Sequence, residues 1–162
     1  MHASRNIPKK HYHILDMIDK INALLMRKSS CVLATTDGTI PHCSLMAYIA
    51  SEAADRLYLA TPMNTKKYSN IKNHPDVSLL IDTRGEQARE NTQAITISGT
   101  CHILDSDEEI DRVKAAFNRR HPHLRDFIRK RGVAFVCVEF DSFLFVEGPE
   151  RVHHEMIRTN RN

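Results

Sequence analysis

Long apolar runs are missing from this chain of 162 residues: none approaches the roughly 20 residues needed to cross a bilayer. Residues 1–10 are polar and lack the apolar segment of a signal peptide. We therefore expect a cytoplasmic protein with no membrane partner. With 41% hydrophobic and 27% charged residues, the composition is that of an ordinary globular domain, which excludes a disordered chain.

Paired cysteines are missing as well. The four cysteines lie singly in strand-like segments, without the spacing of a zinc site or of a small disulfide framework: Cys31, Cys43, Cys101 and Cys137. We predict buried free thiols and no metal site.

The net charge of +3 is too small to indicate a nucleic-acid partner. Basic residues do gather in one segment, Arg112–Gly132, where eight of them accompany one acidic residue. The apolar residues of this segment have the spacing of a solvated helix pair that faces a core. Neither an aromatic strand surface nor a recognition helix is evident, so we expect no nucleic-acid binding.

Periodicity gives the order of the elements. Apolar residues three and four apart predict a helix over His13–Met26, and Ser106 and Glu109 form a capping box for a helix over Asp107–Arg120. A further short helix begins near Thr65. Strands are predicted over Cys31–Thr36, Ile40–Ala50, Arg56–Thr61, Val77–Asp82, Gln93–Leu104, Ala134–Phe140 and Ser142–Gly148.

These elements predict a mainly β protein, a small antiparallel barrel with helical additions. The first two strands form a hairpin at Asp37 and Gly38, and the last two are expected to meet at a tight turn near Asp141 and Ser142. We assign residues 1–148 to a single domain and 149–162 to a polar C-terminal tail, loose or docked on a partner.

The short helix begins with two lysines, Lys66 and Lys67, although the first turn of a helix already carries partial positive charge. Exposed lysines at a frayed helix end cost little, so they need no special explanation. The alternative is that an anion, most simply a phosphate, binds here to the amides, the lysines and the hydroxyl of Thr65.

Several short segments of the sequence occur in an order typical of one family. They are "VLATTDGTIPHCSLMAYI", "LYLAT", "NTKKYSNIKNHPDVSLLI" and "ITISGTCHILDSDEEIDRVKAAF". Over Cys31 to Phe117 the chain resembles the pyridoxamine 5'-phosphate oxidase-like superfamily of FMN-binding split barrels. The resemblance implies a split β-barrel with flanking α-helices.

The resemblance also implies a flavin site. A hydroxyl residue and two basic residues hold the FMN phosphate in the family, and their positions here are Thr65, Lys66 and Lys67. Thr61 matches a residue that contacts the flavin, and Gln93 resembles a glutamine that reaches it from the neighbouring subunit. The strand residues that would line the flavin ring are Ser44, Leu45, Met46, Ala47 and Tyr48. A homodimer with flavin sites at its interface is implied.

Two departures argue against oxidation of pyridoxamine phosphate. Relatives with that activity carry an arginine at the position of Ser44 and a lysine at that of Ile49. We therefore expect an FMN-dependent oxidoreductase of another kind, a flavin reductase or a reductase of a small electrophilic substrate, with catalytic residues still unknown.

Two other functions remain open. The chain could carry FMN for electron transfer or sensing without catalysis, or it could handle haem on the same scaffold, with His153 or His154 as an axial ligand. His11 and His13 form a second pair, expected to be exposed at the start of the first helix. The deazaflavin F420 is an alternative cofactor, because its phosphate could use the same lysines.

Overall fold

The structure, a computed structural model, describes residues 9–85, 92–149 and 151–156, with side chains from residue 17 to residue 155 of these ranges. Its helices and strands in chain order are α1 (Lys9–Arg27), β1 (Ser30–Thr36), β2 (Pro41–Ala50), β3 (Arg56–Pro62), α2 (Lys66–Asn73), β4 (Asp76–Asp82), β5 (Gln93–Ile103), α3 (Asp107–Arg120), the 3-10 helix η2 (Pro122–Leu124), α4 (Arg125–Ile128), β6 (Val133–Glu147) and β7 (Arg151–Met156).

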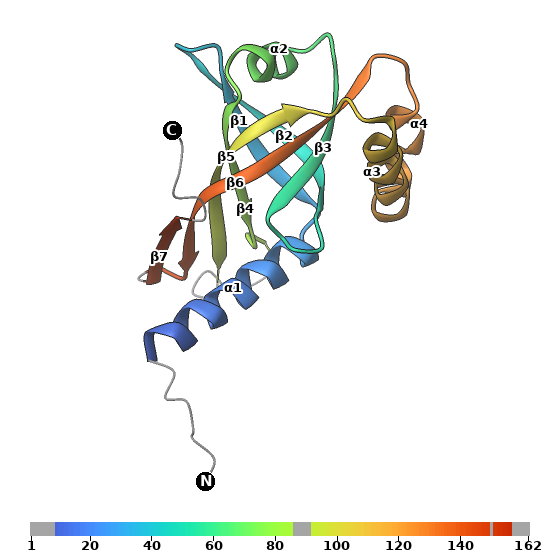
Figure 1. Cartoon of the computed structure of the whole chain (residues 1–162). Coiled ribbons are helices and arrows are strands. Elements are labelled where there is room, and N and C mark those ends of the chain that lie inside the picture. Colours follow the sequence, from blue (N-terminus) through green and yellow to red (C-terminus); the bar gives the residue numbers. More distant parts are fainter. Residues whose placement is uncertain (1–8, 86–91, 150, 157–162) are drawn as a thin grey trace.

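Six antiparallel strands close into a barrel. Their spatial order is β3-β2-β1-β4-β5-β6, and β3 also pairs with β6 from Arg56↔Glu139 to Pro62↔Val133. Strand β7 extends the sheet from the second half of β6. Helices α1 and α2 lie at opposite ends of the barrel, and α3 and α4 lie to one side (Figure 1). The predicted split barrel with flanking helices is confirmed.

Strand β6 corrects one expectation. The turn predicted near Asp141 and Ser142 does not form, because β6 runs without interruption through both residues. Its partners on β5 change register there, since Ser98 pairs with Ser142 while Gly99 pairs with Phe140. Asp141 is therefore an extra residue, a β-bulge that bends the strand. This bend lets the first half of β6 pair with β3 and the second half with β7.

The C-terminal segment differs from the expectation as well. No strand was predicted beyond residue 148, yet Arg151–Met156 pair with Ser142–Glu147 as strand β7. Residues 150 and 157–162 lie outside the described residues. Strand β7 ends the sheet, because β6 is its only partner among the described strands.

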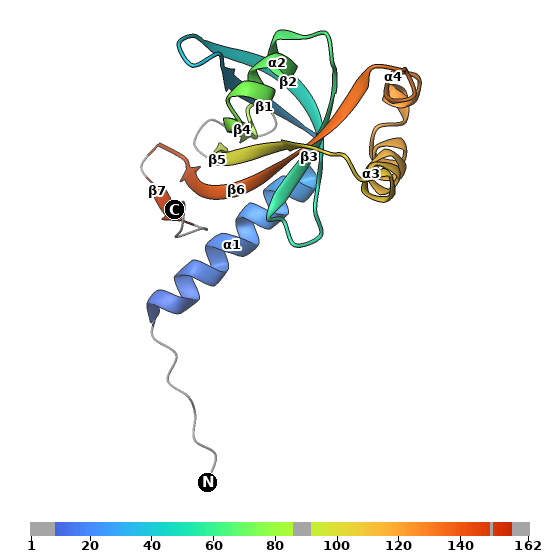
Figure 2. The same cartoon turned by 45° about the horizontal axis from the view of Figure 1, so that its top comes forward.

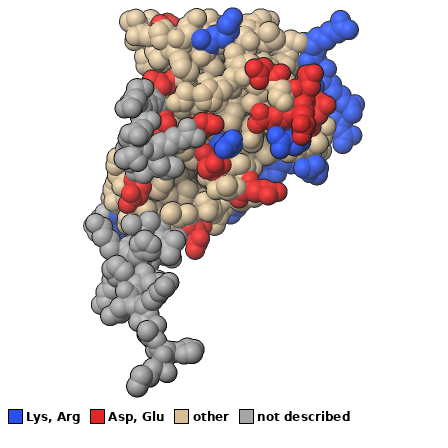
Figure 3. All heavy atoms as spheres, in the orientation of Figure 1, with Lys and Arg blue, Asp and Glu red and all other residues tan. Residues whose placement is uncertain are grey.

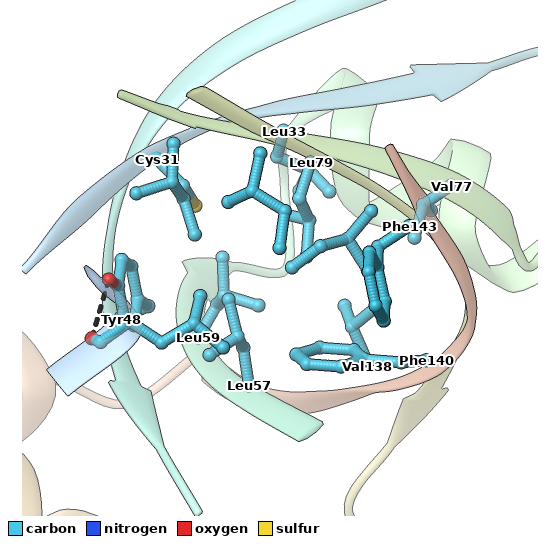
Figure 4. Close-up of a cluster of buried hydrophobic side chains, with 14 of the residues drawn as sticks. Cys31, Leu33, Tyr48, Leu57, Leu59, Val77, Leu79, Val138, Phe140 and Phe143 are labelled. Atoms are coloured by element: carbon cyan, nitrogen blue, oxygen red, sulfur yellow. Dashed lines mark hydrogen bonds between the residues drawn. The ribbon is translucent and has the colours of Figure 1, made fainter. Parts of the chain in front are cut away.

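The barrel interior is apolar, and α1 covers one end of it. Leu33, Leu57 and Leu59 are fully buried in the barrel, and Leu25 of α1 is 1% exposed (Figure 4). The hydroxyl of Tyr48 on β2 donates a hydrogen bond of 2.8 Å to the Leu25 carbonyl. Among the described helices, none combines the length and apolarity needed to cross a membrane.

A second apolar cluster lies outside the barrel. Helices α3 and α4 pack against the outer face of β3 and β6, beside the barrel in both views (Figures 1 and 2). The buried residues of this cluster are Ala60, Val113, Phe117, Ile128 and Phe135. The prediction that the basic segment 112–132 turns its apolar residues to a core is therefore confirmed.

All four cysteines are free thiols. Cys31, Cys101 and Cys137 are buried, and loss of hydration raises the pKa of each thiol to about 12. Cys43 is exposed on β2, so the expectation of burial is wrong for this residue.

The bulge in β6 requires a glycine on the facing strand. A Cβ atom at Gly99 would clash with the carbonyl oxygen of Glu139 and would lie 2.9 Å from Cγ1 of Val138. The two backbones approach too closely at this point for any side chain.

We expect Gly99→Ala to lower the free energy of unfolding by about 1 to 3 kcal/mol, because the added methyl group overpacks the bulge. Denaturant titration of the two proteins measures this change. The matched control is Ser98→Ala, on the same strand but exposed, which should change stability by less than about 0.5 kcal/mol. Equal effects of the two substitutions would contradict this account of the bulge.

Candidate functional site

The start of α2 is fixed by threonine hydroxyls. Thr65 is the N-cap, and its Oγ1 accepts a hydrogen bond of 3.4 Å from the Tyr68 amide. The same hydroxyl donates to the Pro62 carbonyl at 2.8 Å and lies 3.2 Å from Oγ1 of Thr61. Thr61 is only 1% exposed. Thr61 therefore lies behind the turn and supports Thr65.

The two lysines at this helix start have different surroundings. Nζ of Lys66 lies 3.7 Å from the carboxylate of Asp37, in the hairpin between β1 and β2. Backbone N–H groups of Ile40 and Thr39 donate to the same carboxylate, and with Lys66 nearby they hold the pKa of Asp37 below its usual range. Lys67 is half-buried and lines a cavity instead.

This cavity, which we call the Lys67 cavity, has a volume of about 440 Å³. It lies between β2 and β3 on one side and the segment from α3 to α4 on the other. Its lining residues are Ser30, Leu45, Met46, Ala47, Ala60, Pro62, Lys67, Phe117, His123, Leu124 and Phe127. The walls are mostly apolar, and one cation borders them. Such a site fits a flat apolar ring that carries an anionic group.

Strand β2 contributes only part of its predicted set to this cavity. Leu45, Met46 and Ala47 line it. Ser44 pairs with the fully buried Leu33 and therefore faces the barrel interior. Tyr48 is 1% exposed, and burial raises the pKa of its hydroxyl. The side chains of Ser44 and Tyr48 thus serve the barrel core, although their backbones run along the site.

Gln93 lies away from the other predicted site residues. Its Nε2 donates a hydrogen bond of 3.3 Å to the Glu147 carboxylate, which also accepts one of 3.2 Å from Lys20 of α1. Because α1 and α2 lie at opposite ends of the barrel, Gln93 does not approach the Lys67 cavity of its own chain (Figure 1).

Sequence reasoning missed the wall of the cavity that α3, η2 and α4 provide. His121, at the end of α3, is 3% exposed, and its Nε2 lies 2.9 Å from the Tyr48 carbonyl oxygen. Since a carbonyl only accepts, Nε2 carries the proton in this contact. The ring of His121 also contacts Phe117 and His123, with centroids 5.5 and 5.8 Å apart. This histidine therefore ties the wall to β2.

The C-terminal histidines lie on β7. His153 pairs with Phe145 and His154 with Leu144, and both histidines are exposed. Because adjacent strand residues point to opposite faces, these two side chains diverge. His11 and His13 belong to α1, where side chains are not described.

Comparison with known proteins identifies a family that this chain matches. The chain matches the family described as pyridoxamine 5'-phosphate oxidase over residues 17–147. A comparison with curated proteins finds no match.

Three solved structures illustrate the similarity of fold. A haem-binding protein from Mycobacterium smegmatis is 16% identical, with a TM-score of 0.76 over 86% of this chain and 57% of that chain. An FAD-binding protein from Mesorhizobium loti is 18% identical, with a TM-score of 0.67 over 81% and 93%. General Stress Protein 26 from Bacillus anthracis is 18% identical, with a TM-score of 0.67 over 87% and 98%.

These identities show the fold alone, whereas the family match spans most of the sequence. It runs from within α1 to the end of β6 and so includes the barrel, the start of α2 and the α3–α4 wall. The chain therefore belongs to the pyridoxamine 5'-phosphate oxidase family, within the split-barrel superfamily that its sequence resembles.

Proposed function

We propose that this protein binds FMN in the Lys67 cavity and acts as an FMN-dependent oxidoreductase. The observation that carries the proposal is the meeting of Lys67, the start of α2 and the outer side chains of β2 at one cavity. FMN supplies the redox chemistry when it is bound, so the residues of this chain have to bind and orient it.

The two ends of FMN need different surroundings, and the cavity offers both. The first-turn N–H groups of α2 that the Thr65 cap leaves unpaired, together with Lys67, suit a phosphate dianion. The Thr65 hydroxyl donates to the Pro62 carbonyl and so orients this turn. Leu45, Ala47 and Phe127 provide apolar surface for the isoalloxazine ring. Lys66 is the weaker candidate ligand, because Asp37 already partly neutralises it.

The substrate is not pyridoxamine phosphate in this proposal. Ser44 faces the barrel interior and Ile49 packs against the outer apolar cluster, so neither position supplies a cation for a substrate phosphate. A flavin reductase, or a reductase of a small electrophilic compound, remains the favoured activity. A carrier or sensor of electrons is the alternative, and bleaching of the flavin by NADH or NADPH separates an enzyme from a carrier that only a partner protein reduces.

Haem handling is the second candidate function. It draws on the similarity to the haem-binding protein of Mycobacterium smegmatis and on the exposure of His153 and His154 on β7. Neither histidine lines the Lys67 cavity, so haem bound to one of them would lie outside this cavity.

A homodimer would complete the flavin site. Cross-strand partners place one row of side chains on the outer face of the sheet: Leu45, Val32, Leu80, Thr96, Leu144 and His154. Leu45 is 78% exposed and also lines the Lys67 cavity. A second copy packed on this row would bury apolar surface and border the cavity, which would let Gln93 of the partner subunit approach the flavin.

The purified protein should release FMN on denaturation, with a flavin absorbance spectrum and the mass of FMN. Absorbance spectroscopy and mass spectrometry of the released compound provide the measurement. Release of F420 would keep the site but change the cofactor. A haem spectrum that disappears in His153→Ala or His154→Ala would favour the second candidate.

Lys67→Ala should weaken FMN by roughly 1.5 to 3 kcal/mol, or about ten- to a hundredfold, because it removes a charge-assisted contact to the phosphate. Lys66→Ala should have a smaller effect, since Asp37 engages this lysine. Fluorescence quenching measures the affinities. Lys72→Ala, in the last turn of α2, is the matched control.

Riboflavin, which lacks the phosphate, should bind poorly and be nearly indifferent to Lys67→Ala. Without cofactor, the same substitution should leave stability unchanged or slightly raised, because it removes positive charge from a helix N-terminus. Unchanged FMN affinity in both lysine variants would contradict the proposed contact between these lysines and the phosphate.

Leu144→Arg should shift the protein from dimer to monomer and weaken FMN, although Leu144 does not line the cavity. The reason is that a charge would be buried in the apolar row. Light scattering and FMN titration give the two readouts. Met26→Arg, at an exposed apolar residue of α1, is the control. A stable monomer with stoichiometric FMN would refute the shared site.

A further inference from the structure

A second cavity, of about 400 Å³, adjoins the first, and we call it the Arg131 cavity. Its lining residues are Pro62, Met63, Asn64, Phe127, Lys130, Arg131, Gly132 and Val133. Pro62 and Phe127 line both cavities. A ligand in one cavity therefore borders the other.

Backbone contacts fix the shape of this second cavity. The Met63 amide donates a hydrogen bond of 2.8 Å to the Gly132 carbonyl, which ties the loop before α2 to the turn between α4 and β6. Within that turn, the Lys130 amide donates to Phe127 at 3.1 Å, and Gly132 has a positive φ of 82° that suits glycine. The turn holds its two cations next to the start of α2.

The lining combines cations with apolar and amide groups. Lys130 and Arg131 carry positive charge, and none of the described residues that line the cavity is acidic. Met63, which is 50% exposed, and Phe127 offer apolar and aromatic surface, and Asn64 offers an amide. Phosphate oxygens favour arginine and lysine, while a planar base favours aromatic surface and an amide partner.

The two cations are available to a ligand. Among the described residues, neither Lys130 nor Arg131 forms an ion pair with a carboxylate, in contrast to Lys66, which lies beside Asp37. Lysine and arginine side chains line the edge of the molecule that carries α3 and α4, beside a group of acidic side chains (Figure 3). The basic side chains along this edge would attract a polyanionic ligand.

We propose that the Arg131 cavity binds the adenosine diphosphate part of a dinucleotide whose other half lies at the Lys67 cavity. The phosphates would contact Lys130 and Arg131, and the adenine would lie against Met63 and Phe127. The inference rests on the proposed function, because a flavin in the Lys67 cavity gives the dinucleotide its reason to span both. Both volumes are within the range of about 300–1,000 Å³ typical of small-molecule sites.

Two ligands carry this adenosine diphosphate. It could belong to FAD, with the flavin in the Lys67 cavity; the phosphate next to riboflavin would then stay at Lys67, and the phosphate of the adenosine half would contact Lys130 and Arg131. Or it could belong to NADH or NADPH, whose nicotinamide would approach bound FMN. Both ligands would place the same chemical group in the Arg131 cavity. The experiment therefore needs one arm for each ligand.

In the first arm, fluorescence quenching measures the affinities of the cofactor-free protein for FAD and FMN. In the second, calorimetry measures binding of ADP, pyrophosphate, NADH and NADPH to the FMN-loaded protein. Each arm compares the natural chain with the double variant Lys130→Ala/Arg131→Ala. The matched control is Arg125→Ala/Arg129→Ala, which removes two exposed arginines of the same region that line neither cavity.

If FAD is the source, the double variant should weaken FAD about ten- to a hundredfold and leave FMN unchanged. If a nicotinamide donor is the source, it should weaken ADP and NADH or NADPH by a similar factor on the FMN-loaded protein. The control variant should change none of these affinities by more than about threefold.

Three results would overturn the proposal: affinities for FAD, NADH and NADPH that do not depend on Lys130 and Arg131, an equal loss in the control variant, or pyrophosphate that binds as tightly as ADP. Failure to bind FMN would instead count against the Lys67 cavity, and ADP binding by the cofactor-free protein would still test the Arg131 cavity. The two proposals can therefore fail separately.

Discussion

The pairing of β3 with β6 is the constraint on which the rest of the site depends. It joins segments more than 70 residues apart, with Pro62 opposite Val133 at one end. Closing such a long loop costs conformational entropy, and the apolar barrel interior offsets this cost. Only after closure does the loop before α2 lie beside the turn before β6. Both cavities form at this junction, so neither exists without the closed barrel.

Features set by neighbouring residues could be predicted from the sequence. Ser106 caps α3 as expected, and the helix expected to begin near Thr65 has this residue as its cap, because a cap needs only a hydroxyl and an amide three residues away. The β1–β2 hairpin likewise follows from Asp37 and Gly38. The family resemblance brought Leu45, Met46, Ala47 and Lys67 into one site, and the structure places these four at one cavity. The resemblance also implied Ser44 and Tyr48, whose side chains face the barrel interior, and Thr61, whose hydroxyl supports Thr65.

Features set by distant residues could not be predicted. Lys66 and Lys67 are chemically identical in the sequence, and only the fold brings Asp37 to one of them. The polar pair at Asp141 and Ser142 signals a break in a strand, but whether it becomes a turn or a bulge depends on the facing strand. The spacing of apolar residues in segment 112–132 predicted that they face a core. That some of them, such as Phe127, also line a cavity is evident only from the packed structure.

Tyr48 is held at both its side chain and its backbone. Its hydroxyl binds the Leu25 carbonyl of α1, while its own carbonyl accepts from His121 at the end of α3. Two peripheral helices that do not follow one another in the chain are thus joined through one residue of β2. Separate fraying of either helix would leave a buried polar group of Tyr48 without its hydrogen-bond partner, which is costly. The N-terminal helix and the cavity wall therefore belong to one cooperative unfolding unit with the second strand, so that protection from amide exchange should extend across all three.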